Sequence, residues 1–95
     1  MNKYVLIEKG SRGFIEGVEV VDSKLEYEDF CNKLYEDKVN SMKKGLDKEE
    51  LEELNEYLLE FGGVGDVYDG YIEVGFSEEE WIEVFKVEGL YGGVV

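Results

Sequence analysis

Apolar and polar residues form two short strand-like runs near the start of the chain. The runs cover residues 3–9 and 14–21, and valine alternates with glutamate in the second. Residues 10–13, between them, are Gly, Ser, Arg and Gly, which favour turns. Two such runs joined by a four-residue turn predict a β-hairpin. Gly17 predicts a bulge, because a glycine inside a strand often marks one.

The apolar spacing then changes to the period of a helix. Ser23 and Glu26 have the spacing of a capping box, and Gly45 is typical of the residue that stops a helix. This pattern predicts a first helix that follows Ser23 and runs to about Lys44. The apolar side of this helix comprises Tyr27, Phe30, Cys31, Leu34 and Met42.

A second helix is predicted more strongly. Asp47 and Glu50 form a capping box at its start, and Gly62 stands where the helix should end. We expect its apolar stripe to be buried. The stripe comprises Leu51, Leu54, Leu58 and Phe61.

Glycine and acidic residues dominate the segment after the second helix. Residues 62–65 suggest a flexible connector, and the pair Asp69-Gly70 between strand-forming residues is a strong hairpin signal. Residues 66–76 are therefore either a hairpin or one long bulged strand.

A third capping box, at Ser77 and Glu80, predicts a third helix through about Glu88. Such a helix would carry the apolar residues Trp81, Val84 and Phe85 on one side. The tail at 90–95 either adds a short strand or docks on the domain.

Together these elements predict one α+β domain over residues 1–95. Its order is ββααβ(β)α, and it consists of a small antiparallel sheet of three to four strands with about three helices packed on it. The chain is 43% hydrophobic and 14% aromatic, too much for a disordered acidic tail, so we expect it to fold.

The charge of the chain is distributed unevenly. The formal net charge is −14. Residues 49–95 carry fourteen acids against a single base, Lys86, whereas residues 1–48 carry ten acids against nine bases. A one-sided field of this kind attracts cationic partners and repels nucleic acid and anionic membranes.

The residues needed for most catalytic and metal sites are missing. The chain contains no histidine and one cysteine, Cys31, which lies on the apolar side of the first helix and is expected to be a buried structural thiol. No G-K-[ST] phosphate loop is present. We therefore predict a protein that is not an enzyme and that uses neither a cofactor nor a metal.

Carboxylates line the side of the second helix opposite its apolar stripe. Several pairs, such as Glu49 with Glu53 and Glu56 with Glu60, are like charges four residues apart, a spacing that destabilises a helix. An ordinary solvated face is one interpretation, but a face selected only for solubility could have used lysines. The other interpretation is a partner-binding surface made of Glu49, Glu52, Glu53, Glu56, Glu60, Asp66, Asp69, Glu73, Glu78 and Glu79, with Glu80 and Glu83 beside them.

In size, charge and α+β compactness the chain resembles the small acidic nucleic-acid mimics made by phages and mobile elements. Those proteins block restriction enzymes, CRISPR nucleases or repair enzymes. The resemblance implies a counter-defence inhibitor, anti-restriction or anti-CRISPR, that binds the basic surface of a nucleic-acid-binding enzyme and does not bind nucleic acid itself. An immunity protein that neutralises a basic nuclease toxin would present the same surface.

Two further expectations concern exposed tyrosines and assembly. Tyrosines could anchor a partner, although core packing is favoured for Tyr57 and Tyr71. A homodimer through Trp81, Phe85 and the tail is a different explanation, in which the charge only confers solubility. The N-terminus is interrupted by charge too early for a signal peptide, and no run approaches the ~20 apolar residues that span a bilayer, so we expect a cytoplasmic protein.

Overall fold

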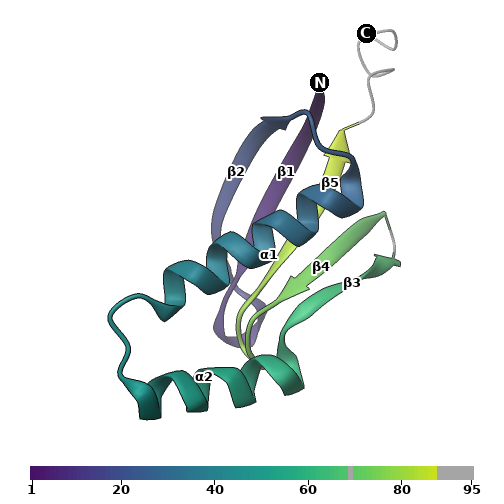
Figure 1. Ribbon diagram of the computed structural model, residues 1–95. Coiled ribbons are helices and arrows are strands. Elements are labelled where there is room, and N and C mark those ends of the chain that lie inside the picture. The colour runs from purple at the N-terminus through teal and green to yellow at the C-terminus, as the bar shows by residue number, and fades with distance from the viewer. Residues whose placement is uncertain (69, 88–95) are drawn as a thin grey trace, which may run out of the picture.

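The computed structural model describes residues 1–68 and 70–87, and its centre is one five-stranded antiparallel sheet (Figure 1). The strands lie in the order β2-β1-β5-β4-β3. In chain order the elements are β1 (Asn2–Lys9), a short 3-10 turn (Ser11–Gly13), β2 (Ile15–Ser23), α1 (Tyr27–Lys43), α2 (Lys48–Phe61), β3 (Gly63–Tyr68), β4 (Tyr71–Gly75) and β5 (Trp81–Val87).

The general α+β class is confirmed, but the numbers of strands and helices differ from the prediction. Within the described residues the sheet has five strands, where three to four were expected. The same residues form two α-helices, where about three were expected. The predicted tail at 90–95 lies outside the described residues.

The N-terminal hairpin forms as predicted. β1 pairs with β2 along its whole length, and the register shifts between Glu8 and Lys9, which lie opposite Gly17 and Ile15. This places the irregularity beside Gly17, where the sequence predicted a bulge. In the connecting turn Arg12 has a φ of 62°, which is uncommon for a residue with a side chain.

The first helix begins later than its predicted capping box. Ser23 still belongs to β2, and its Oγ accepts a hydrogen bond from the backbone N–H of Leu25 at 3.1 Å. The residue that caps α1 is Glu26, without a side-chain hydrogen bond. The capping-box interpretation of Ser23 was therefore wrong, because this residue is paired with Asn2 in the sheet, three positions before the observed N-cap.

The second helix begins and ends as predicted. Asp47 Oδ1 accepts from the N–H of Glu50 at 2.9 Å, Glu50 Oε1 accepts from the N–H of Asp47 at 3.4 Å, and Gly62 caps the other end. The expectation of a buried apolar stripe was wrong, since no residue of α2 is buried. α2 lies beyond the end of the sheet, so its stripe is only half-covered (Figure 1).

The segment after α2 is a hairpin, which decides between the two predicted alternatives. β3 and β4 pair in antiparallel fashion, with a register shift between Val64 and Val67. The expected flexible connector at 62–65 was wrong for its last three residues, because Gly63, Val64 and Gly65 belong to β3.

The predicted third helix is instead β5, which lies in the middle of the sheet between β1 and β4. Trp81, Val84 and Phe85 have helical spacing, but Ile82 and Val84 alternate just as well and are 3% and 0% exposed. As a strand, the segment buries both residues and forms hydrogen bonds on two sides. The supposed capping box is a tight turn in which the N–H groups of Phe76 and Ser77 donate to Glu80 O.

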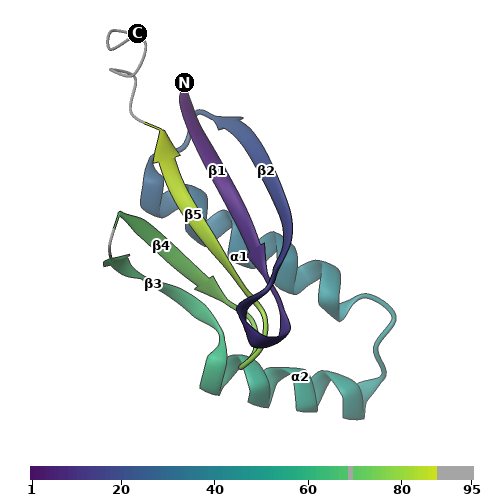
Figure 2. The ribbon, with the colours of Figure 1, turned by 180° about the vertical axis from the view of Figure 1, so that it is seen from behind.

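α1 covers one face of the sheet, and the core lies between them (Figure 1). From α1 the core takes Phe30, Cys31 and Val39, and from the sheet it takes Tyr4, Leu6, Ile72, Val74, Ile82 and Val84. The rear view shows the other face with no helix over it (Figure 2). Among the described residues, no helix has the length and apolar character needed to cross a membrane.

Candidate functional site

The outer side of α2 carries the acidic ridge that the sequence predicted. We define the acidic ridge as Glu49, Glu52, Glu53, Glu56 and Glu60, all of which are exposed. At 1.5 Å per residue, their carboxylates follow the helix axis over about 16 Å. The helix is therefore the element that arranges these charges in a line.

Lysines from the N-terminal half do not neutralise the ridge. Within residues 1–68 and 70–87 the ion pairs are Lys33 with Asp37, at 3.1 Å, and Lys38 with Glu8, at 3.5 Å. Both involve carboxylates outside the predicted surface. The acidic ridge thus has no ion pair within the described part of the chain.

A close approach of the backbone holds the C-terminal end of α2 against the sheet. A Cβ atom on Gly75 would lie 2.7 Å from the carbonyl oxygen of Phe61. A Cβ atom on Gly62 would lie 2.8 Å from both Leu58 O and Tyr35 Oη. Because only glycine fits at these two positions, they fix where α2 leaves the sheet.

The turn between β4 and β5 carries a second group of exposed carboxylates, Glu78, Glu79 and Glu80. Besides the two hydrogen bonds to Glu80 O, Ser77 Oγ accepts from the N–H of Glu79 at 3.3 Å. Glu79 Oε2 in turn accepts from the hydroxyl of Ser11 at 3.2 Å, which ties this turn to the β1–β2 turn. These contacts hold the three carboxylates on an ordered turn.

A groove joins this turn to α2. Its volume is about 400 Å³, and it is lined by Met42, Leu54, Tyr57, Phe76, Ser77 and Glu78–Glu80. Tyr57 is 57% exposed, so the preference for core packing of this residue was wrong. None of the ridge residues lines the groove, and Glu53, ~40° from Tyr57 around the helix axis, comes nearest to it. The turn carboxylates form the acidic rim of the groove, across from Leu54 and Tyr57 of α2.

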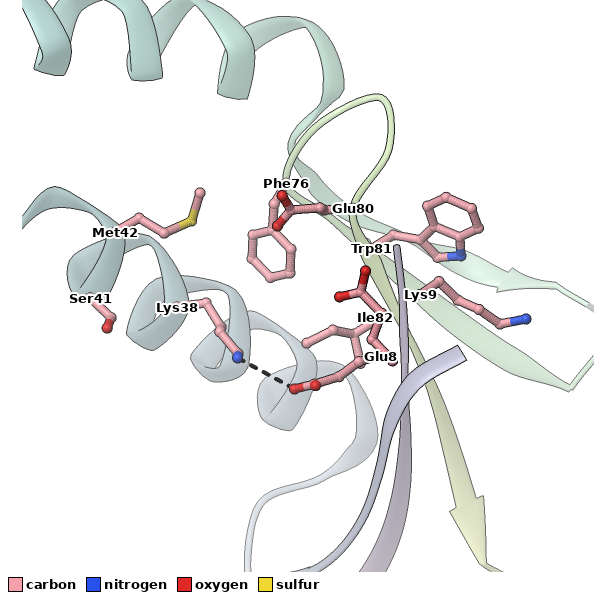
Figure 3. Close-up of a pocket in the computed structure, with 10 residues that line it drawn as sticks. Glu8, Lys9, Lys38, Ser41, Met42, Phe76, Glu80, Trp81 and Ile82 are labelled. Carbon is pink, nitrogen blue, oxygen red and sulfur yellow. Dashed lines mark hydrogen bonds and ion pairs between the residues drawn. The ribbon is translucent and has the colours of Figure 1, made fainter. Parts of the chain in front are cut away.

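A neighbouring hollow of about 320 Å³ extends the groove along α1 (Figure 3). It shares Met42, Phe76 and Glu80 with the groove, so the two have a common apolar floor. Phe76 is held in place by Tyr35, whose ring stacks on it with centroids 5.7 Å apart. The sequence pattern did not indicate this floor, because it placed Met42 on the apolar side of the first helix and Phe76 at the end of the 66–76 segment.

Across the same hollow, Glu8 reaches from β1 toward Lys38 of α1 (Figure 3). Lys9 and Trp81, whose side chains line the hollow only in part, point away from α1. The hollow therefore has an ion pair on one side and the acidic groove on the other.

The remaining predicted site residues are not part of this groove. Asp66 and Glu73 are exposed and line a separate hollow beside β3 and β4. Glu73 alternates with the buried residues Ile72 and Val74, so it points to the face opposite α1. Glu83 shares that face and accepts a hydrogen bond from Trp81 Nε1 at 3.2 Å. Asp69 lies outside the described residues.

The structure offers little for nucleophilic or metal chemistry. Cys31 is fully buried, as predicted, and burial followed by the charge of Glu28 raises its pKa from 9.0 to about 11, which keeps the thiol protonated. Over the described ranges, no three His, Cys, Asp or Glu side chains come together as a metal site. What the arrangement can do is present one row of carboxylates on the outer side of α2 and a second group, Glu78–Glu80, beside an apolar floor.

Comparison of the chain with protein-family models, with curated proteins and with solved structures gave no match.

Proposed function

We propose that this protein is a non-enzymatic inhibitor that occupies the cationic nucleic-acid-binding surface of an enzyme. The observation that carries the proposal is the acidic ridge, whose five exposed carboxylates have no ion pair in the described part of the chain. Cationic grooves that bind phosphates also bind carboxylates, through charge-assisted hydrogen bonds from arginine and lysine.

The charge spacing of the ridge supports mimicry of a nucleic-acid strand. Five carboxylates over about 16 Å correspond to roughly one charge per 4 Å of helix axis. One strand of B-DNA carries a charge about every 3.4 Å along its axis. A protein groove that binds one strand would therefore meet a similar line of negative charge on α2.

The groove beside the ridge supports a contact that is more than electrostatic. Lysine and arginine bury their aliphatic stems on apolar surfaces while their charged ends remain at polar groups. Here Met42 and Phe76 form the floor and Glu78–Glu80 form a rim. A lysine or arginine that enters the groove can pack its aliphatic stem on Met42 and Phe76 and place its charge beside Glu78–Glu80. The exposed ring of Tyr57 can contact the same partner.

The cost of the ridge argues against solubility as its only role. Glu49 with Glu53, Glu52 with Glu56 and Glu56 with Glu60 are like-charge pairs four residues apart, each of which destabilises a helix by about 0.2–0.5 kcal/mol. Lysine at alternate positions would keep the helix soluble and stabilise it. A partner that supplies the missing cations explains why α2 carries no lysine or arginine after Lys48.

As its source we propose a phage or mobile element, where such an inhibitor would act as a counter-defence factor against a restriction, CRISPR or repair enzyme. An immunity protein against a nuclease toxin would use the same surface. We propose the cytoplasm as its compartment, because the one cysteine is an unpaired thiol and the target enzymes act there.

The test begins with capture of the partner. The immobilised protein is exposed to a bacterial lysate at low and at high salt, and the captured protein is identified. The purified partner is then bound to a fluorescent DNA duplex, and the inhibitor is titrated in. We expect the inhibitor to displace the duplex, and the displacement to weaken steeply as salt rises.

The decisive variant reverses the ridge, with Glu53→Lys, Glu56→Lys and Glu60→Lys together. The matched control reverses three exposed carboxylates elsewhere, Glu19, Glu28 and Glu36, for the same change in net charge. We expect the ridge variant to lose displacement by at least about 100-fold, and the control to lose far less. Equal losses in the two variants, or none in the ridge variant, would contradict the proposal.

A further inference from the structure

The face of the sheet opposite α1, which we call the far face, is apolar and uncovered in the described part of the chain (Figure 2). Strand alternation places Val5 and Ile7 of β1 there, beside Val18 and Val20 of β2 and Phe85 of β5. Val18 and Val20 are 64% and 59% exposed. Antiparallel sheets with one free face normally expose polar side chains on it, so this face is unusual.

The charge of the far face differs from that of the whole molecule. Its charged positions are two lysines, Lys3 and Lys9, and four acids, Asp22, Glu73, Glu83 and, at the β3 edge, Asp66, a net charge of −2 out of −14. Two copies of this chain repel each other over most of their surfaces. At the far face they can meet with nearly balanced charge and with apolar residues in contact.

The shape of the far face is also self-complementary. Val18 and Val20 are exposed at the β2 edge, whereas a hollow of about 410 Å³ at the other edge is lined by Gly63, Gly65 and Gly75 together with Asp66 and Glu73. A two-fold axis parallel to the strands places β2 of one copy over β3 and β4 of the other. Register places Val18, which is level with Ile7, Glu83 and Glu73, over this hollow.

We propose that two copies of this chain form a dimer by packing far face on far face, with the two-fold axis along β5. Two sheets that pack in this way keep their strands within about 30° of each other. The contact is isologous, which means that both copies use the same surface and that each contact between them occurs twice. This inference is independent of the proposed inhibitor function, because the acidic ridge lies on α2 and outside the contact.

Register identifies the ion pair that would join the copies. Lys9 lies level with Trp81 and Gly75, and Glu73 is two residues along β4 from Gly75. Across the axis, Lys9 of one copy lies over Gly75 and Glu73 of the other. Within one chain Glu73 lies beside Glu83, an unfavourable like-charge neighbour. A lysine from the second copy would relieve that repulsion.

The size of the contact predicts a weak dimer. The five strands have five to nine residues each. At a spacing of about 4.8 Å between strands and a common length of about six residues, they give a face of roughly 24 by 20 Å. Two such faces bury on the order of 1,000 Å², the lower end of the range for specific interfaces. We therefore expect a dissociation constant in the micromolar range, which sedimentation equilibrium can measure.

The first test compares an apolar-to-acidic change on the far face with the same kind of change elsewhere. Val20→Glu introduces a charge into the contact, and Leu59→Glu is its control, since Leu59 is 88% exposed on α2. We expect a wild-type dimer that persists in high salt, a Val20→Glu protein that stays monomeric at about 300 µM, and a Leu59→Glu protein that dimerises like the wild type.

The second test is a charge exchange. Lys9→Glu should raise the dissociation constant at least about tenfold, by placing like charges together across the axis, and adding Glu73→Lys should restore it to within about threefold. Within one chain the two positions lie about 12 Å apart, two strands over and two residues along, too far for a direct ion pair. Restoration therefore requires the second copy.

A wild-type protein that remains monomeric throughout the concentration range overturns the proposal. So does a dimer that Val20→Glu leaves intact, or a double variant no tighter than Lys9→Glu alone. Circular dichroism of each variant checks that the fold is retained, so that loss of the dimer is not confused with unfolding.

Discussion

The hydroxyl of Tyr27 bridges two strands through Ile72 and Val84. It accepts a hydrogen bond from the N–H of Ile72 at 3.1 Å and donates one to the carbonyl oxygen of Val84. Ile72 and Val84 are register partners in β4 and β5. The first residue of α1 is therefore built into the pairing between two strands, which locks the helix to the sheet.

Removal of that hydroxyl should destabilise the fold. Tyr27→Phe keeps the ring but leaves the N–H of Ile72 and the carbonyl of Val84 without this partner, at residues that are 1% and 0% exposed. We expect a loss of about 1–3 kcal/mol in the free energy of unfolding. Urea denaturation measures it, and Tyr57→Phe, the same change on an exposed ring, is the control. Equal effects of the two variants would show that the bridge adds nothing.

Alkaline pH should destabilise the protein through Cys31. The thiol has a pKa of about 11 in the fold against an ordinary value of 9.0, so the unfolded state loses its proton first. Its stabilising effect is complete below pH 9 and is lost as the pH rises to about 11, a fall of roughly 2–3 kcal/mol. Burial also raises the pKa of Tyr4 and of Tyr27, which continues the loss in the same direction.

The measurement is the free energy of unfolding at intervals from neutral pH to about pH 11. Cys31→Ala removes the contribution of the thiol, so its stability should fall less over that range. If the wild-type protein and the variant lose stability in parallel, the thiol is not the cause.

A methyl group on Gly75 should disturb the attachment of α2. The added Cβ would meet the carbonyl oxygen of Phe61 at 2.7 Å, and backbone cannot move aside cheaply. We expect Gly75→Ala to cost about 1–3 kcal/mol. Gly17→Ala is the matched control in another strand, because its nearest atom, at 2.8 Å, is the flexible carboxylate end of Glu8. Thermal unfolding compares the two, and a Gly75→Ala protein as stable as the control would show that α2 is not held at this point.

Reversal of one ridge charge should stabilise the helix while it weakens the proposed function. Glu56→Lys replaces two like-charge pairs, with Glu52 and with Glu60, by two pairs of opposite charge. The expected gain in the free energy of unfolding is roughly 0.8–2 kcal/mol at low salt, because two repulsions are lost and two attractions are added, and it should shrink in high salt.

Glu56→Gln, which removes repulsion without adding attraction, should fall between the wild type and Glu56→Lys. A Glu56→Lys protein less stable than the wild type would indicate that Glu56 makes a favourable contact in the fold. The interpretation of the ridge as a cost to the helix would then be wrong.

The elements that the sequence predicted well are those fixed by neighbours in the chain. The capping box of Asp47 and Glu50 and the stop at Gly62 define α2 within its own residues, and the first hairpin has its turn between its two strands. The failures concern long-range partners. Residues 81–87 fit a helix and a strand equally well, and only the places offered by β1 and β4 favour the strand.

In the candidate site, too, the sequence predicted the part that depends on neighbours in the chain and missed the part that depends on distant residues. Helical period alone places the five ridge carboxylates on one side of α2, because 3.6 residues per turn leave no other arrangement. It could not show that Glu78–Glu80 lie across a groove from that helix, since this depends on how α2 leaves the sheet at Gly62 and Gly75. Nor could it show that Glu73 points to the far face.

The sequence by itself determined that this protein folds as an α+β domain, that it lacks histidine, and that one helix carries a line of like charges. Tertiary structure decided which apolar residues are buried and which remain open on the far face and in the groove. The physical reason is that helix and turn signals act over a few residues, whereas burial depends on which distant strands and helices come into contact.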